Sequence, residues 1–353
     1  METSEIEVHS MSQEYVWALT VSDDIEKCFS KGCKRCSSFH YLHQWEQESY
    51  SAFCKRVDYI LENKVHSTSK IIKKYKNSGL TGMLDKFPKG DKFYKVDSNA
   101  FESLSEKLAS ILLKCSDLDP DSYISYELAP LIIDDKFKIG CESLNFKKEY
   151  LYEQILFYLQ SQESNRSKST KKAIFKVLHQ MGEIEQKFQL LLELITLKTA
   201  VPESIIEKRL LSMMAFDLLI LNRDRHFGNL IFLDDLKEKV NPIPLFDYGN
   251  SVIGGINSDE VVNNFFAKTK SMGDIWNIVV NQNDRMFNEP FYRLGEFTFS
   301  NDFFLYFDYE KILHELEEFE KEQLLYKSCE VELSIELLLY CLERTEDFLW
   351  KRI

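Results

Sequence analysis

The chain lacks any long apolar run, which excludes one class of protein. A membrane-spanning helix needs about 18 or more consecutive apolar residues, and no such run occurs in the 353 residues. The first sixteen residues, METSEIEVHSMSQEYV, are polar and acidic, unlike the basic and then apolar pattern of a secretory signal. We therefore expect a cytoplasmic protein without a membrane span, although a secreted effector without a readable signal would look the same.

The chain also lacks the positive charge of a general nucleic-acid binder. Lys and Arg number 44 against 57 Asp and Glu, a formal net charge of −13, so nucleic acid is not an expected partner. The charge is unevenly spread, because residues 27–95 hold 15 Lys and Arg against 6 Asp and Glu. A solvated face, a docking surface and a field that attracts an anionic nucleotide all remain open for this stretch.

Apolar residues, in contrast, are plentiful. With 44% hydrophobic and 13% aromatic residues, the chain is expected to be globular, with a sizeable core in one large or two ordinary domains. In a reducing cytoplasm its eight cysteines would be thiols or metal ligands rather than disulfides. Four residues near the N-terminus have spacings that allow a tetrahedral zinc site, with plain reduced thiols as the alternative: Cys28, Cys33, Cys36 and His40.

The stretch 222–248, NRDRHFGNLIFLDDLKEKVNPIPLFDY, carries the clearest chemistry. Asp224 and Asn229 follow one apolar run and Asp247 follows another, and LIFL and PIPLF are typical of the two strands of a hairpin. Phosphoryl transfer needs a carboxylate that orients a hydroxyl and accepts its proton, and it needs hard oxygen ligands for magnesium. Asp224 fits the first role, and Asn229 with Asp247 fits the second. A surface loop followed by an ordinary Asp-Tyr-Gly turn is the alternative.

The order of residues in this loop indicates a particular kind of kinase. D-R-H-F-G-N keeps the five-residue interval between the catalytic Asp and Asn of protein kinases, and D-Y-G stands for D-F-G. The histidine follows the aspartate instead of preceding it, and the connection to D-Y-G is short. The loop thus resembles the bacterial HipA-like serine/threonine kinases, including their smaller CtkA-type members, and more distantly the phosphoinositide kinases. The resemblance runs from about Lys76 to the C-terminal helices.

The resemblance implies an α+β, two-lobed protein-kinase-like fold. Residues 1–75 would be an N-terminal extension with the Cys/His cluster and a basic helix, 76–146 a small β-rich N-lobe, and 147–353 a larger, mostly helical C-lobe. The implied function is ATP- and magnesium-dependent transfer of the γ-phosphate to a serine or threonine of a protein substrate, together with autophosphorylation. An antitoxin or other regulatory protein is the further partner that the family suggests.

The resemblance also assigns nucleotide-binding residues. Lys95 lies in KFYKVD among aromatic residues, where a buried ammonium needs a partner, and the family makes it the lysine that contacts the α- and β-phosphates. The partner should lie on the next helix, where Glu102 and Glu106 share a face, and the offset in the family favours Glu102. A flexible turn is expected to approach the phosphates through its backbone N–H groups. It contains Ser78, Gly79, Thr81 and Gly82.

That turn departs from the G-x-G-x-x-G loop of ordinary kinases, and an A-P-E segment is missing after D-Y-G. Ser78 and Thr81 are candidates for autophosphorylation, with an ordinary solvated turn as the alternative. Three other functions stay open: a phosphoinositide kinase, a catalytically inactive kinase fold used for binding, and a zinc-dependent N-terminal binding module attached to a kinase.

Secondary structure is predicted for several further segments. Residues 47–75 have helical spacing, 123–141 read as two strands around an Asp-Asp turn, and Pro202 is suited to the start of a helix. Asp217, inside that last helix, is expected to support the catalytic loop. Helical stripes continue from residue 309 to the end of the chain.

Overall fold

The computed structural model describes most of the chain from residue 55 onward. The described residues are 55, 58–60, 62–77, 85–97, 101–134, 136–145, 148–150, 180–199, 201–226, 229–233, 244–252, 271–326 and 328–353. The Cys/His cluster, the predicted glycine-containing turn and the segment after D-Y-G from residue 253 to 270 lie outside these ranges.

The structure is a mixture of strands and helices. Its strands are β1 (Val65–Ser67), β2 (Asp85–Lys89), β3 (Lys92–Val96), β4 (Glu127–Ile133), β5 (Lys136–Leu144), β6 (Lys148–Tyr150), β7 (Ile231–Leu233), β8 (Leu305–Phe307) and β9 (Trp350–Arg352). Its α-helices are α5 (Ser69–Asn77), α6 (Glu102–Lys114), α9 (Ile184–Thr199), α10 (Glu203–Leu219), α12 (Met272–Val280), α13 (Phe291–Ser300), α14 (Tyr309–Glu322) and α15 (Ser328–Thr345).

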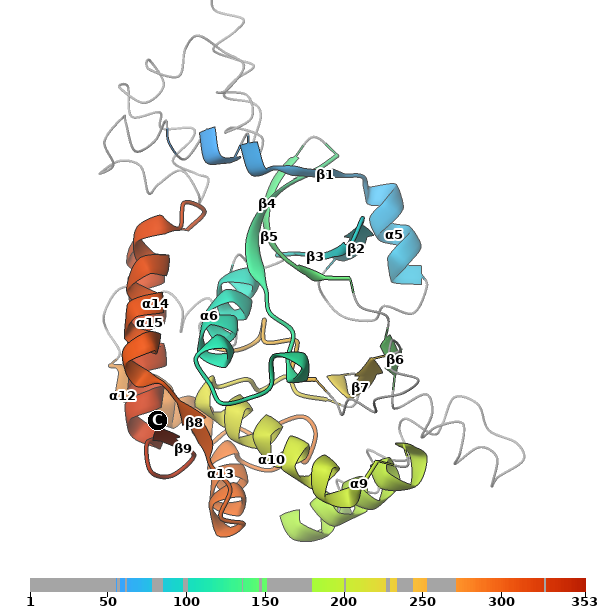
Figure 1. Ribbon diagram of the computed structural model, residues 1–353, viewed down its shortest axis with the longest axis vertical. Coiled ribbons are helices and arrows are strands. Elements are labelled where there is room, and N and C mark those ends of the chain that lie inside the picture. The colour runs from blue at the N-terminus through green and yellow to red at the C-terminus, as the bar shows by residue number, and fades with distance from the viewer. Residues whose placement is uncertain are drawn as a thin grey trace, which may run out of the picture.

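Five strands form a curled sheet in the order β1-β4-β5-β3-β2 (Figure 1). All neighbours are antiparallel except β1 and β4, which run parallel. A tight turn joins β2 to β3, with Gly90 at φ +63°, a conformation that glycine adopts without strain. The register of this hairpin places Lys86 opposite Lys95, and β5 places Cys141 on the other side of Lys95.

The two faces of the sheet bury different surfaces, because successive side chains of a strand point to opposite sides. On one face, Phe87, Tyr94 and Leu131 are buried in a small apolar cluster with Ile72 of α5. On the other face, Cys141 and its neighbours belong to the large core that continues through α6 into the helical part. Lys95 therefore points toward α6, away from α5.

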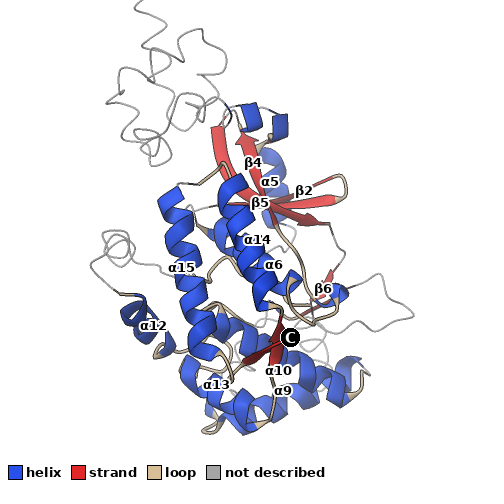
Figure 2. Cartoon of the chain, turned by 60° about the vertical axis from the view of Figure 1, so that its left-hand side comes forward, coloured by secondary structure: helices blue, strands red, loops and turns tan. Residues whose placement is uncertain are grey.

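Helices dominate the rest of the described chain (Figures 1 and 2). α9, α10 and α13 lie at the end opposite the sheet, while α14 and α15 run alongside α6. Buried side chains of all these helices, with Leu108 and Leu112 of α6 fully inaccessible, form one continuous core. Within the described part of the chain, every helix is too short or too polar to cross a bilayer.

Several sequence predictions are confirmed. β4 and β5 flank the Asp-Asp turn, Pro202 is the residue that precedes the first turn of α10, and α14 and α15 occupy the C-terminal region. The separation into a strand-rich earlier part and a helix-rich later part also agrees with the α+β expectation. The predicted domain boundaries at residues 75 and 146 stay predictions.

One prediction of secondary structure holds only in part. Within residues 47–75, the described residues 58–60 and 62–63 and the helix α5 are helical, as expected. The strand β1 interrupts them, because its three residues pair with the edge of β4. The strand β7 pairs with β6, and Leu245, in the described part of PIPLF, makes an isolated bridge to Tyr123. Residues 234–243, which connect LIFL to the rest of PIPLF, lie outside the described residues, so the predicted hairpin stays a prediction.

Candidate active site

The side chain at the centre of the site is Lys95 on β3. It is 3% exposed, and its ammonium contacts the carboxylates of Glu106, on α6, and Asp247, the latter at 2.7 Å. The ring of Tyr126 lies under the same ammonium, 4.6 Å from nitrogen to ring centre. Burial alone would lower the pKa of Lys95, but the charges of Asp247 and Glu106 hold it well above its ordinary value. The lysine is thus a charged group that is buried and paired with two carboxylates.

The carboxylate that reaches this lysine is that of Glu106, so the choice of Glu102 is corrected. Glu106 is completely inaccessible, and its second oxygen accepts a hydrogen bond of 2.9 Å from the backbone N–H of Tyr248. Glu102 lies one helical turn earlier, and its charge acts on Asp97, whose pKa burial raises to about 7 with a further contribution from Glu102. Glu106 therefore connects three elements that are far apart in sequence: β3, α6 and the turn after Asp247.

The turn that carries Asp247 is held in one conformation. Asp247 has φ +65°, which costs energy for a residue with a side chain, although Asp tolerates it better than most. The hydroxyl of Ser105 donates to the backbone oxygen of Ser251 at 2.6 Å, and Ser251 in turn donates to the oxygen of Tyr248. A side chain at Gly249 would meet the Cβ of Glu102 at 3.2 Å. Close packing on α6 therefore fixes where the Asp247 carboxylate lies.

A buried ion pair fixes the same turn from the other side. Arg225 donates two hydrogen bonds, of 2.7 and 2.8 Å, to the carboxylate of Asp217, and a third of 2.5 Å to the backbone oxygen of Phe246. Asn222 adds a bond of 2.9 Å to Asp217. The charge of Asp217 outweighs burial and raises the pKa of Arg225. The expected role of Asp217 as a buried support for this loop agrees with these contacts.

The other two predicted catalytic side chains, Asn229 and Asp224, reach this turn. The Asn229 amide donates to one carboxylate oxygen of Asp247, while Lys95 contacts the other. Asp224 is partly exposed; one of its oxygens accepts a 2.8 Å bond from Asn250 and the other is contacted by Arg285, whose side chain is 63% exposed. The fold thus brings Lys95 and Asp247, which are 152 residues apart in the sequence, into one cluster.

Asp247 and Asn229 have the donor chemistry of a magnesium site. Burial would raise the pKa of Asp247, but the charges of Lys95 and Lys86 hold it well below its ordinary value, so the carboxylate is ionised. A carboxylate and an adjacent amide are hard oxygen ligands, and magnesium is usually held by one or two such groups plus phosphate and water. The Asn229 oxygen accepts from the backbone N–H of His226 at 3.2 Å, so the amide would have to turn to present that oxygen.

Lys86 is a residue of this site that the sequence prediction missed. It lies opposite Lys95 across the β2–β3 hairpin and on the same face of the sheet. Burial lowers its pKa, while the nearby Asp247 acts in the opposite direction. Its ammonium makes no hydrogen bond or ion pair with another residue that the structure describes. A signal was present in the sequence, since a two-residue Gly-Asp turn sets the register that pairs residues 86 and 95.

His226 lies between Asp224 and Asn229, in the predicted catalytic loop. Burial lowers its pKa, with Asp224 and Asp247 acting in the opposite direction. Its backbone oxygen accepts a 2.8 Å bond from the N–H of Asn229. These backbone contacts agree with a structural role for the histidine in the loop.

Several predicted site residues are not placed by the structure. Ser78, Gly79, Thr81 and Gly82 of the glycine-containing turn lie outside the described residues, and so do Cys28, Cys33, Cys36 and His40. Among the residues that are described, no group of three or more His, Cys, Asp or Glu side chains could hold a metal ion. The phosphate-binding turn and the zinc site therefore stay predictions.

Comparison with models of protein families and with curated proteins gives no match. Among solved structures, the chain is similar to the crystal structure of the Helicobacter pylori proinflammatory kinase CtkA, with 14% sequence identity and a TM-score of 0.46. The similarity covers 74% of this chain and 88% of that chain. A similarity at this level assigns no role to any residue. The roles proposed for the residues of the site therefore rest on the contacts that these residues make in this structure.

Proposed function

We propose that the chain is an ATP- and magnesium-dependent serine/threonine protein kinase of the HipA-like type. The observation that supports this most directly is the single cluster in which Lys95 contacts Glu106 and Asp247 while Asn229 contacts Asp247. It combines a buried cation for phosphate with a pair of oxygen ligands for magnesium, and Asp224 lies five residues before Asn229. Phosphoryl transfer requires these groups in one place.

The two lysines of the sheet would bind the nucleotide. Lys95 is positioned by Glu106 and would contact the phosphates as a fixed positive charge, and Lys86 would add a second one from the neighbouring strand. Charges that are already oriented in a poorly hydrated site stabilise a developing negative charge more than mobile charges in water do. Magnesium held by Asp247 and Asn229 would neutralise charge on the phosphate oxygens.

Asp224 would act on the attacking hydroxyl. Its carboxylate is 31% exposed and is oriented by Asn250, so a substrate hydroxyl can reach it. The hydroxyl oxygen forms a bond to the γ-phosphorus, the bond from that phosphorus to the bridging oxygen of ADP breaks, and Asp224 accepts the hydroxyl proton. Arg285 contacts the same carboxylate from an exposed position, so a substrate must displace or share this contact.

Calorimetry of ATP binding, with and without magnesium, tests the proposal. The wild-type protein should bind ATP at least about tenfold more tightly with magnesium, a difference of about 1.4 kcal/mol. Asp247→Asn should lose that difference, because an amide is a weaker ligand, while the left-handed backbone is retained. Asp302→Asn is the matched control, since Asp302 is exposed and also has a positive φ, of +52°. ATP affinity that does not change with magnesium in the wild type would contradict the proposal.

A further inference from the structure

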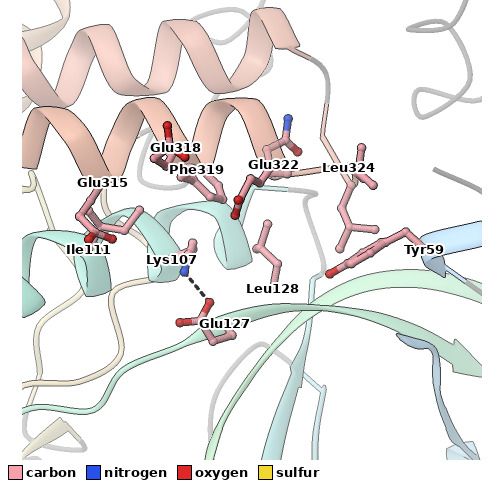
Figure 3. Close-up of a pocket in the computed structure, with 12 residues that line it drawn as sticks. Tyr59, Lys107, Ile111, Glu127, Leu128, Glu315, Glu318, Phe319, Glu322 and Leu324 are labelled. Atoms are coloured by element: carbon pink, nitrogen blue, oxygen red, sulfur yellow. Dashed lines mark hydrogen bonds and ion pairs between the residues drawn. The ribbon is translucent and has the colours of Figure 1, made fainter. Parts of the chain in front are cut away.

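A cavity lies on the far side of α6 from Lys95. It has a volume of about 280 Å³, is open to solvent on one side, and is bordered by α6, α14 and the start of β4, with Tyr59 at one end (Figure 3). None of the residues assigned above to nucleotide or magnesium lines it. Sites for whole small-molecule ligands usually start at about 300 Å³, so this cavity has room for one or two side chains.

The floor of the cavity is apolar. Ile111 of α6 and Phe319 of α14 are 2% and 8% exposed, and Leu128 and Leu325 complete the surface. Figure 3 shows Leu128 and Tyr59 facing the space below α14. A side chain that entered would transfer its apolar surface out of water, a gain of about 25 cal/mol per Å² buried.

The rim is acidic. Glu315, Glu318 and Glu322 lie on α14 at spacings of three and four residues, so they share one face of the helix and repel one another. Glu318 contacts Lys321 at 3.1 Å, but Glu315 and Glu322 make no ion pair with any residue in the described part of the chain. Glu322 is also the last residue of α14, where the helix dipole adds negative charge.

Two described lysines near the cavity are already engaged. Lys107 contacts the carboxylate of Glu127 (Figure 3), and Lys114 contacts its other oxygen at 2.7 Å. The ammonium of Lys107 also lies 5.8 Å from the ring centre of Phe319, on the cavity wall. Glu315 and Glu322 are therefore left to attract a cation from outside.

We propose that this cavity binds a segment of a partner protein in which an arginine or lysine stands beside an apolar side chain. The apolar side chain would fill the floor between Ile111 and Leu128, and the carboxylates of Glu315 and Glu322 would attract the cation. Relief of the repulsion along α14 adds to the attraction.

Occupancy of the cavity would also be communicated to the active site, a step that rests on the proposed kinase function. Lys107, on the cavity wall, follows Glu106 directly in α6. On the other side, the loop after α14 leads to Tyr326, whose hydroxyl donates to Asp97 at 2.8 Å. Asp97 accepts from the N–H of Ser103 at 2.9 Å, in the first turn of α6. A partner that binds here would stabilise α6 in the position that holds Glu106 against Lys95.

Binding is tested with the full chain and two fluorescent peptides, without nucleotide. One peptide alternates arginine with phenylalanine, and the other has glutamate in place of arginine. Fluorescence anisotropy should show saturable binding of the arginine peptide and no saturable binding of the glutamate peptide. The double variant Glu315→Gln with Glu322→Gln should weaken that binding about five- to tenfold. Glu320→Gln, on the same helix but away from the cavity, should leave it unchanged.

Three results would overturn the proposal. They are equal binding of the two peptides, equal binding by the double variant, and displacement of the arginine peptide by spermine at the same or lower concentration. The last would identify the occupant as a free polyamine.

Coupling is measured separately, as the affinity for ATP with and without saturating arginine peptide. The peptide should tighten ATP binding at least about fivefold. An unchanged ATP affinity would overturn the coupling. If ATP does not bind under any condition, the proposed kinase function fails, whereas the peptide-binding result is unaffected.

Discussion

Replacement of Glu106 by glutamine is the perturbation that tests the architecture of the site in most detail. Glu106 is fully buried and accepts hydrogen bonds from Lys95 and from the Tyr248 N–H. Removal of one member of a buried ion pair costs about 3–5 kcal/mol. In the variant, Lys95 would keep its ion pair with Asp247, which is 2.7 Å away. The glutamine side chain would still offer one oxygen as a hydrogen-bond acceptor. The free energy of unfolding of Glu106→Gln should therefore fall by less, about 2–3 kcal/mol.

The same change should weaken ATP binding, because Lys95 would then be drawn toward Asp247 and away from the phosphates. Urea unfolding gives the stability, and calorimetry with magnesium and ATP gives the affinity, which should fall about tenfold or more. Glu102→Gln is the matched control, one helical turn away, and should change ATP affinity less than about twofold, or about 0.4 kcal/mol. Loss of ATP binding in Glu102→Gln, with Glu106→Gln like wild type, would refute this account of the site.

Three further outcomes are expected. Lys86→Met should weaken ATP binding about tenfold, whereas Lys89→Met, on the same strand but the opposite face, should not; calorimetry compares them. Asp97, with its pKa raised to about 7, binds a proton more tightly when folded, so the stability that it contributes is fully present below about pH 4 and is lost as pH rises to about 7. Urea midpoints should show this decline, and Asp97→Asn should flatten it. Asp217→Ala should lower the free energy of unfolding by about 3–5 kcal/mol, because it leaves the buried Arg225 uncompensated, and an unchanged urea midpoint would contradict this.

Much of the candidate site could be predicted from short patterns. The positions of Asp224, Asn229 and Asp247 after apolar runs gave the residues that the fold brings together, and aromatic neighbours marked Lys95 as buried. These features are local, so the sequence shows them directly. The pairing of β4 with β5 was equally accessible, since a turn joins two apolar runs.

The choice between Glu102 and Glu106 could not be made from local sequence patterns. Both lie on one face of α6, because their spacing of four residues is close to one helical turn. What separates them is the turn after Asp247, which brings Gly249 against Glu102 and the Tyr248 N–H against Glu106. That contact joins residues 142 positions apart, and no local pattern encodes it.

β1 was missed for a related reason. Its three residues, Val-His-Ser, have little strand preference as a set, and they are extended because the edge of β4 offers them backbone partners. The cavity beside α6 could not be predicted from the sequence either, since it exists only where α6, α14 and β4 meet. Long-range packing, rather than local preference, decides all of these features.

The measurement that tests the central claim most directly is transfer of phosphate to a hydroxyl. The purified chain is incubated with ATP and magnesium, alone and with a generic protein substrate, and intact masses and peptide maps are then recorded. The wild type should gain phosphate on serine or threonine, and Asp224→Asn should gain none while still binding ATP. Bound ATP without phosphate on either protein in the wild type, or equal phosphate in Asp224→Asn, would contradict the assignment of this site to protein phosphorylation.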